Sequence, residues 1–280
     1  MPTIHPTAVV SPKAELASGV YVGPYCTIDA GVTVNAGTEL RSHVSLTGNT
    51  TLGEGNVVWP FTCIGADPQD LKYDGEDSLT VIGDHNEIRE NVTIHKGTAN
   101  DHGKTVIGSH NLIMAYAHIA HDCVVKDHVV ITNAVQLAGH VLIEQGAAIG
   151  GASAVHHFVT IGTAAFVAGM TRVVHDVPPY MTVEGNPAKV RGINAIGVRR
   201  RELPPGTGDK LKDAYRRLYR YMEDNSVGET AAALDSLAAD YPDCPEVQAV
   251  VESVRQSTAG VHGRYREALR SDDRYTNPVK

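Results

Sequence analysis

Five histidines lie in three short segments of the chain, and their spacing favours acid–base chemistry. The segments are AHIAHDC (117–123), LAGHV (137–141) and VHHF (155–158), and they contain His118, His121, His140, His156 and His157. A neutral imidazole, with a pKa of about 6.5 in model peptides, can take a proton from a hydroxyl group near neutral pH. Three imidazoles can also bind zinc and leave one position open for water. General base catalysis and a metal site therefore both remain open, beside a structural role.

A six-residue repeat of aliphatic residues surrounds these histidines. Every sixth residue is aliphatic from Ile4 to Ile64, and again from Ile82 to Ile94; after a shift of one residue the period continues from Ile107. Neither an α-helix nor an alternating strand keeps such a period over this length. The pattern is typical of a parallel β-helix, in which three units form one 18-residue coil and the aliphatic side chains point inward.

The 18-residue coil predicts which residues become neighbours. Residues 18 apart lie above one another at about the spacing of paired strands, ~4.8 Å. His121, Gly139 and His157 form one predicted column, and Asp122 and His140 form the next. The histidines are therefore expected to cluster on one edge of the prism. A glycine in that column allows close approach of a substrate, and its N–H can stabilise an oxyanion.

Two polar segments interrupt the repeat, near residues 66–80 and 96–104. A solenoid accommodates an insertion by extruding it, so we expect two loops that leave the β-helix. We assign residues 1–192 to this all-β parallel β-helix.

A small α-helical domain is predicted for residues 193–280. From about Gly208 apolar residues recur at helical spacing, Ser226 to Glu229 resembles a capping box, and Pro245 is expected to begin a helix. The last dozen residues are expected to be loose.

The composition favours a soluble cytoplasmic protein without nucleic acid as a partner and without membrane insertion. The net charge is −8, and neither a targeting signal nor a membrane-spanning segment is apparent. No GxSxG motif occurs, and Cys123 is expected in the wall of the prism, so we expect direct attack by a substrate hydroxyl without an acyl-enzyme. The cysteines form no CxxC pair and are expected to be buried thiols: Cys26, Cys63, Cys123 and Cys244.

Several segments resemble a known enzyme family. IGADPQDLKYDGE (64–76), IRENVTIHKGT (88–98), AHIAHDC, QLAGHV and DVPPYMTVEGNPA (176–188) are similar to the acyl-carrier-protein-dependent UDP-N-acetylglucosamine O-acyltransferases of lipid A synthesis. The resemblance implies a left-handed β-helix and a homotrimer with active sites between subunits. It also implies transfer of a 3-hydroxyacyl chain from acyl carrier protein to the 3-hydroxyl of UDP-N-acetylglucosamine. No metal or cofactor is implied, because the carrier's phosphopantetheine thioester supplies the acyl group.

The resemblance further implies roles for individual residues. His121 matches the general base, Asp122 the residue that orients it, and Gly139 the oxyanion donor. Gly169 matches the position that sets acyl-chain length, where glycine leaves room for a longer chain. The residues that match substrate-binding positions are Asp70, Lys72, His118, His140, His156, Asn194, Arg200 and Arg201.

Three residues depart from the family pattern. His157 stands in place of a glutamine and is expected to bind the sugar, while Pro187 and Ile196 replace polar groups near the nucleotide. An acceptor with a 3-amino group therefore remains open.

Other functions remain alternatives. The related N-acyltransferase normally has an additional N-terminal domain, whereas the repeat here begins at Ile4. A zinc hydrolase of the carbonic-anhydrase kind is disfavoured by the QDLKY segment and the Arg199–Arg201 run, which suits phosphate. A non-catalytic trimeric scaffold is disfavoured by the clustering of His, Asp and Gly on one edge.

Overall fold

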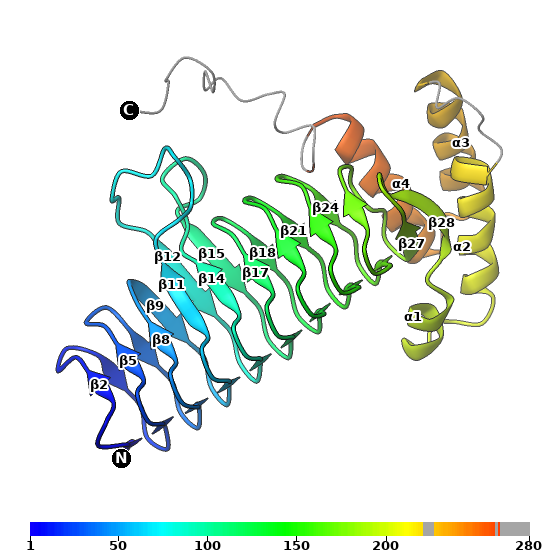
Figure 1. Cartoon of the computed structure of the whole chain (residues 1–280). Helices are drawn as coiled ribbons and strands as arrows, with labels where there is room; N and C mark the ends of the chain where they lie inside the picture. The colour runs from blue at the N-terminus through cyan, green and yellow to red at the C-terminus, as the bar shows by residue number, and fades with distance from the viewer. Residues whose placement is uncertain (221–226, 261–262, 264–280) are drawn as a thin grey trace.

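The computed structural model describes residues 1–220, 227–260 and 263, and it shows a three-sided, left-handed parallel β-helix with helices at one end (Figure 1). Each coil adds a short strand to each of three stacked sheets. This arrangement confirms the predicted fold class.

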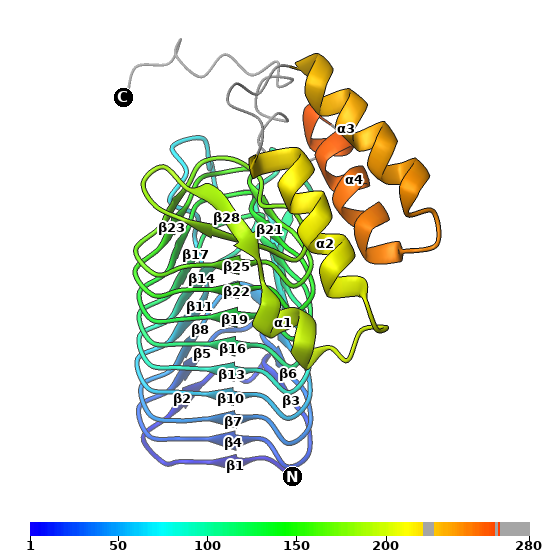
Figure 2. The same ribbon diagram turned by 90° about the vertical axis from the view of Figure 1, so that its right-hand side faces the viewer.

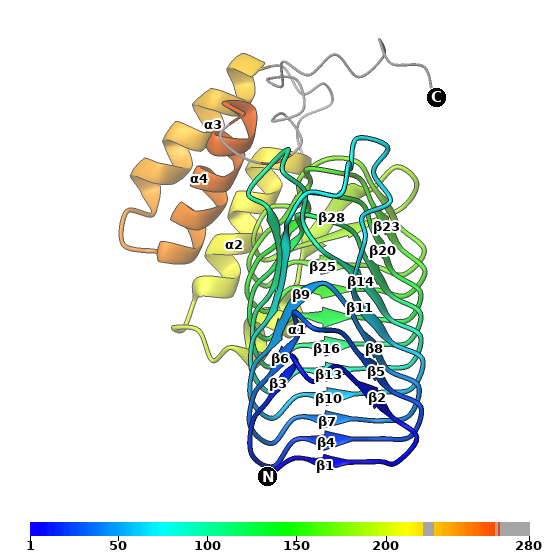
Figure 3. The same ribbon diagram turned by 90° about the vertical axis from the view of Figure 1, so that its left-hand side faces the viewer.

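The three sheets form the sides of a prism (Figures 2 and 3). In stacking order, the first sheet consists of β1 (Thr3–Ile4), β4 (Tyr21–Val22), β7 (Glu39–Leu40), β10 (Val57–Val58), β13 (Glu87–Ile88), β16 (Leu112–Ile113), β19 (Val130–Ile131), β22 (Ala148–Ile149), β25 (Phe166–Val167), β27 (Met181–Glu184) and the antiparallel β28 (Lys189–Ile193). The second consists of β2 (Val9–Val10), β5 (Thr27–Ile28), β8 (Ser45–Leu46), β11 (Cys63–Ala66), β14 (Thr93–His95), β17 (His118–Ile119), β20 (Gln136–Leu137), β23 (Ala154–Val155) and β26 (Arg172–Val173). The third consists of β3 (Glu15–Leu16), β6 (Thr33–Val34), β9 (Asn49–Leu52), β12 (Leu79–Ile82), β15 (Lys104–Ile107), β18 (Val124–Val125), β21 (Leu142–Ile143) and β24 (Thr160–Ile161).

The aliphatic residue of each repeat fills the interior of the prism. Ile119 pairs with Leu137, eighteen positions later, and both side chains are buried. The first coil differs, because β1 is the end strand of its sheet in the part of the chain that the structure describes: Ile4 is 43% exposed although its position in the repeat predicts an inward side chain. Burial therefore depends on neighbouring coils on both sides.

Two corners of the prism matter for the site. The corner between the second and third sheets contains the turns 120–123, 138–141 and 156–159, and we call it the loop corner. Two loops leave the β-helix here, residues 67–78 between β11 and β12 and residues 96–103 between β14 and β15 (Figure 1). The corner between the third and first sheets contains the turns 108–111, 126–129, 144–147 and 162–165, and we call it the helix corner.

The helical region packs around a second apolar core, which it shares with the end of the β-helix through Ala164, Tyr180 and Met181. It comprises α1 (Ala195–Arg200), α2 (Thr207–Tyr215), the π-helical turn η1 (Arg216–Arg220), α3 (Val227–Asp240) and α4 (Pro245–Thr258). Leu211, Leu237 and Val247 are fully buried in this core, and α4 begins at the predicted proline. Ser226 of the predicted capping box and the predicted loose C-terminus lie outside the described residues.

The described part of the chain contains no helix that combines the length and the apolar character needed to span a membrane.

Candidate active site

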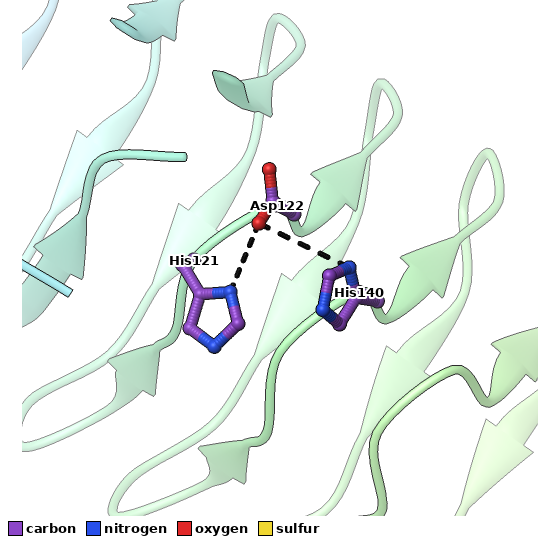
Figure 4. Close-up of side chains that lie close together, drawn as sticks. All are labelled: His121, Asp122 and His140. Atoms are coloured by element: carbon purple, nitrogen blue, oxygen red, sulfur yellow. Dashed lines mark hydrogen bonds and ion pairs between the residues drawn. The ribbon is translucent and has the colours of Figure 1, made fainter. Parts of the chain in front are cut away.

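The loop corner brings His121, Asp122 and His140 together, as the predicted columns require (Figure 4). Nδ1 of His121 lies 2.9 Å from Oδ2 of Asp122, and Nδ1 of His140 lies 3.9 Å from the same oxygen. The two imidazole rings are nearly perpendicular, at 89°, with centroids 4.9 Å apart. All three side chains are largely buried, so their mutual interactions are weakly screened by solvent.

Asp122 is a buried carboxylate that remains ionised. Burial alone raises the pKa of Asp122, but hydrogen bonds from His121 and Thr98 outweigh burial and hold this pKa below its usual value. Thr98 donates both through its backbone N–H, 3.0 Å from Oδ1, and through Oγ1, 2.6 Å from Oδ2. A carboxylate only accepts hydrogen bonds, so the proton of neutral His121 lies on Nδ1 and its Nε2 becomes the acceptor.

Gly139 lies directly against the imidazole of His121. A Cβ at this position would lie 2.5 Å from Cε1 and 2.7 Å from Nε2 of His121, so any other residue would displace the ring. Within residues 1–220, 227–260 and 263, no acceptor is paired with the N–H of Gly139. The backbone of Gly139, with an N–H free to donate, therefore packs against the His121 ring and its acceptor nitrogen, which suits attack of a hydroxyl on a carbonyl group.

Two further histidines lie on the second sheet beside this group. Nδ1 of His118 lies 2.7 Å from Oγ1 of Thr93, and burial, followed by the charge of His121, lowers the pKa of His118. The ring of His95 packs edge-on against His118, with centroids 4.9 Å apart. Burial lowers the pKa of His95 to about 4, with smaller contributions from His118 and His121.

His95 was not singled out from the sequence. Its side chain is 6% exposed, and its Nδ1 has no hydrogen-bond partner among the described residues. His95 follows Ile94 at the point where the repeat shifts, so the 18-residue spacing does not predict its neighbours. The only indication in the sequence was that His95 belongs to the IHKGT segment, which resembles the family.

An aromatic residue completes the column of His140. Phe158 stacks on the His140 ring, with centroids 4.4 Å apart and planes within 4° of parallel. His156 and His157 lie beside it, and their own centroids are 3.9 Å apart. Phe158 was also missed, although it follows His140 by 18 residues and the column rule predicts the contact.

The first loop carries Asp70 and Lys72, and it is fastened next to the loop corner. Oδ1 of Asp70 accepts a hydrogen bond from the backbone N–H of Lys72 at 3.0 Å. The loop is anchored where Nζ of Lys96 lies 2.9 Å from Oδ1 of Asp67. Lys96 directly follows His95, so this ion pair links the first loop to the histidine cluster.

The structure places Asn194, Arg200 and Arg201 away from the histidine cluster. Oδ1 of Asn194 caps α1 by accepting from the N–H of Gly197, and its Nδ2 donates to the carbonyl of Ala164 at the helix corner. Nη2 of Arg201 donates to the carbonyl of Gln145 at the same corner, at 3.0 Å. Arg200 ends α1 and is exposed. Within one chain, these three residues therefore form a group separate from the histidine cluster.

Gly169 belongs to neither group. It lies in the turn between β25 and β26, at the corner between the first and second sheets, and a Cβ there would lie 3.3 Å from the carbonyl oxygen of Gly151. Its role in acyl-chain length stays a prediction. Of the residues that depart from the family pattern, Ile196 is exposed on α1.

Among the described residues, one group has the spacing of a metal site, namely His121, Asp122 and His140. Their candidate ligand atoms lie within 4.8 Å of one another. However, Asp122 also accepts hydrogen bonds from the N–H and the hydroxyl of Thr98, and Nδ1 of His140 lies 2.8 Å from Oδ2 of Asp101. Because these atoms already form carboxylate–imidazole pairs, the arrangement fits acid–base chemistry better than zinc binding.

Cys123 is unsuited to act as a nucleophile. Its side chain is fully buried in the wall of the prism, and burial raises its pKa to about 12. The thiolate is the nucleophilic form of cysteine, so this residue is inert near neutral pH.

Family models match two parts of the chain. Residues 176–262 match domain 2 of UDP-N-acetylglucosamine O-acyltransferase, and residues 104–139 match the bacterial transferase hexapeptide repeat.

Individual relatives match almost the whole chain. The acyl-[acyl-carrier-protein]–UDP-N-acetylglucosamine O-acyltransferase of Stutzerimonas stutzeri is 44% identical over 93% of this chain and 99% of its own length. The enzyme of the same name from Thermodesulfovibrio yellowstonii is 42% identical over 93% of this chain and 99% of its own. The structure of UDP-N-acetylglucosamine O-acyltransferase from Moraxella catarrhalis superposes with a TM-score of 0.86, at 42% identity, and covers 91% of this chain and 97% of that one.

Proposed function

Because this chain belongs to the acyl-[acyl-carrier-protein]–UDP-N-acetylglucosamine O-acyltransferase family, we propose that His121 is the general base of its acyl transfer. In this proposal a 3-hydroxyacyl chain passes from acyl carrier protein to the 3-hydroxyl of UDP-N-acetylglucosamine. The observation that carries the proposal is the buried Asp122–His121 pair at 2.9 Å, with the ring nitrogen Nε2 lying against Gly139.

The proposed reaction proceeds in two proton-coupled steps. Nε2 of His121 removes the proton of the sugar hydroxyl as its oxygen forms a bond to the thioester carbonyl carbon. The carbon–sulfur bond then breaks, and the imidazolium returns the proton to the phosphopantetheine thiolate. The products are the acylated sugar nucleotide and the free thiol of the carrier, so neither a cofactor nor an acyl-enzyme is needed.

Charge compensation accompanies both steps. The ionised Asp122 lies at Nδ1 of His121, so it stabilises the imidazolium that forms when the hydroxyl loses its proton. The N–H of Gly139 is the proposed donor to the tetrahedral oxyanion, a contact whose loss typically costs about a hundredfold or more in rate.

The separation of the two residue groups supports an active site that is shared between subunits of a homotrimer. The loop corner contains the acid–base residues, whereas Arg200 and Arg201, which suit binding of a diphosphate, lie by the helix corner. A parallel trimer can bring the loop corner of one subunit beside the helix corner of the next, since cyclic symmetry repeats one contact between different surfaces.

The proposal is tested by measuring acyl transfer from carrier proteins that bear 3-hydroxyacyl chains of increasing length. UDP-N-acetylglucosamine and its 3-amino analogue serve as acceptors, because His157 stands beside His156 where the family pattern has glutamine. We expect transfer to UDP-N-acetylglucosamine by the wild type and loss of several hundredfold in His121→Ala. Full activity of His121→Ala would overturn the role of His121. Transfer to the 3-amino sugar alone would instead change the acceptor, and stoichiometric zinc in active protein would favour a metal mechanism.

A further inference from the structure

The second loop contacts both imidazoles of the loop corner through their carboxylates. Thr98 donates through both its N–H and its hydroxyl to Asp122, which in turn pairs with His121. Three residues further along the loop, Oδ2 of Asp101 lies 2.8 Å from Nδ1 of His140. Each imidazole is therefore paired through Nδ1 with a carboxylate, one from the coil and one from the loop.

The surroundings of His140 fix the position of its ring. Phe158 stacks on the ring with centroids 4.4 Å apart, and His121 makes a perpendicular contact with it, with centroids 4.9 Å apart. Only 6% of the His140 side chain and 18% of the Asp101 side chain are exposed. Rotation of the ring would break the pair with Asp101, so its two nitrogens are not interchangeable.

We propose that Asp101 is a positioning residue that fixes His140 as the Nδ1–H tautomer, with Nε2 as a hydrogen-bond acceptor for a substrate. A carboxylate cannot donate, so the shared proton belongs to Nδ1 and Nε2 retains its lone pair. Nε2 then accepts from a hydroxyl or amide N–H group of the bound sugar nucleotide or of the phosphopantetheine arm. This assignment rests on the proposed function, since it presumes that the substrates bind at the loop corner.

Asp101 also contacts a second imidazole, because Nδ1 of His102 lies 3.3 Å from its Oδ1. The loop is also held by a hydrogen bond from the N–H of Ala99 to Oε1 of Glu76, at 3.1 Å. Asp101 could serve only to anchor the second loop. The experiment must therefore separate loop anchoring from an effect on His140.

A double-mutant cycle makes this separation. Asp101→Ala, His140→Ala and the double variant are compared with the wild type, and the exposed neighbour Asn100→Ala is the matched control. We expect Asp101→Ala to lower kcat/KM for one of the two substrates by about tenfold, mainly through a higher KM. This is the usual loss for a hydrogen bond to a charged group. In the His140→Ala background the same substitution should change kcat/KM less than about twofold. The substrate whose KM changes identifies the donor that His140 recognises.

Asp101→Asn refines the cycle, because an amide oxygen can still accept from Nδ1 without the negative charge. It should retain much of the activity that Asp101→Ala loses. Equal losses from Asp101→Ala in both backgrounds, or no loss in either, would overturn the proposal.

A second readout does not depend on activity. Nitrogen-15 spectra of histidine-labelled protein report which ring nitrogen carries the proton, and the signal absent from His140→Ala identifies His140. We expect protonated Nδ1 in the wild type and loss of this preference in Asp101→Ala. If the wild type transfers no acyl group but shows this tautomer, the proposed function fails while the role of Asp101 stands. A proton on Nε2 alone in the wild type would overturn the positioning role.

Discussion

At the helix corner, His85, His110 and His128 stack on consecutive coils, with ring centroids 5.2 and 5.0 Å apart. At the loop corner, His121 and His140 also lie on consecutive coils, but their rings are perpendicular and both are paired with carboxylates. The first column is exposed, whereas the second is largely buried.

The difference shows that columns of histidines follow from the repeat, while their chemistry follows from the loops. Any residue type that recurs every 18 positions stacks at the spacing of paired strands. Thr98 and Asp101, which pair with Asp122 and His140, come from the second loop, where the repeat is interrupted. A histidine in this fold becomes a catalytic candidate where a loop adds burial and a charged partner.

The largest effect is expected from His121→Ala, compared with His85→Ala at the far end of the exposed stack. Removing a general base should lower kcat by about a hundred- to ten-thousandfold. His85→Ala should change kcat less than about threefold, because it removes only an exposed ring contact. Both are measured by single-turnover acyl transfer. Similar losses in the two variants would remove the distinction between the corners.

Gly139→Ala should have the next largest effect. Its methyl group would lie 2.5 Å from Cε1 of His121, so the ring must shift away from the proposed reacting position. A misplacement of a catalytic group by about 1 Å can lower the rate about a hundredfold, so we expect a loss of kcat of this order.

Gly192→Ala is the matched control, since a Cβ at Gly192 meets nothing within 4 Å and its φ is not in the left-handed region. Assays of kcat together with thermal unfolding separate a catalytic loss from misfolding. Unchanged kcat in Gly139→Ala would contradict the close packing of the ring on this glycine.

The sequence predicts the periodic part of this site well and the non-periodic part poorly. The coil of 18 residues places His121 beside Gly139, and Asp122 beside His140, because stacked coils share one register. The path of a loop has no such register, so the contact of Asp101 with His140 was not predicted.

The helical end of the chain shows the same limit. Arg201 follows the end of the repeat, and its position at the helix corner depends on how β28 turns the chain back toward the prism. The family resemblance implied a substrate-binding role for Arg201 and active sites between subunits, but it did not indicate the contact of Arg201 with the helix corner.

A smaller effect, on stability, should distinguish the buried His95 from exposed histidines. Because burial lowers its pKa to about 4, His95 stays neutral in the folded state while the unfolded chain takes up a proton below about pH 6.5. The contribution of neutral His95 to the free energy of unfolding is therefore complete above pH 6.5 and is lost as the pH falls toward 4. The loss in unfolding free energy is at most roughly 3 kcal/mol.

His95→Gln lacks this titration, so the difference in unfolding free energy between wild type and variant should decrease between pH 7 and pH 4.5. Denaturant unfolding at both values measures it, and His43→Gln, at an exposed position, is the control. A difference that is independent of pH would contradict the burial of a neutral imidazole.

The central claim is that the loop corner of one subunit works with the helix corner of its neighbour. It is tested most directly by mixing two inactive variants, His121→Ala and the double variant Arg200→Ala/Arg201→Ala, through joint unfolding and refolding or coexpression. Random assembly of a trimer would leave about one quarter of the inter-subunit sites with both intact surfaces, and activity should return to about a quarter of the wild-type value. If the mixture stays as inactive as the separate variants while mixed trimers are shown to form, the two corners do not build one active site.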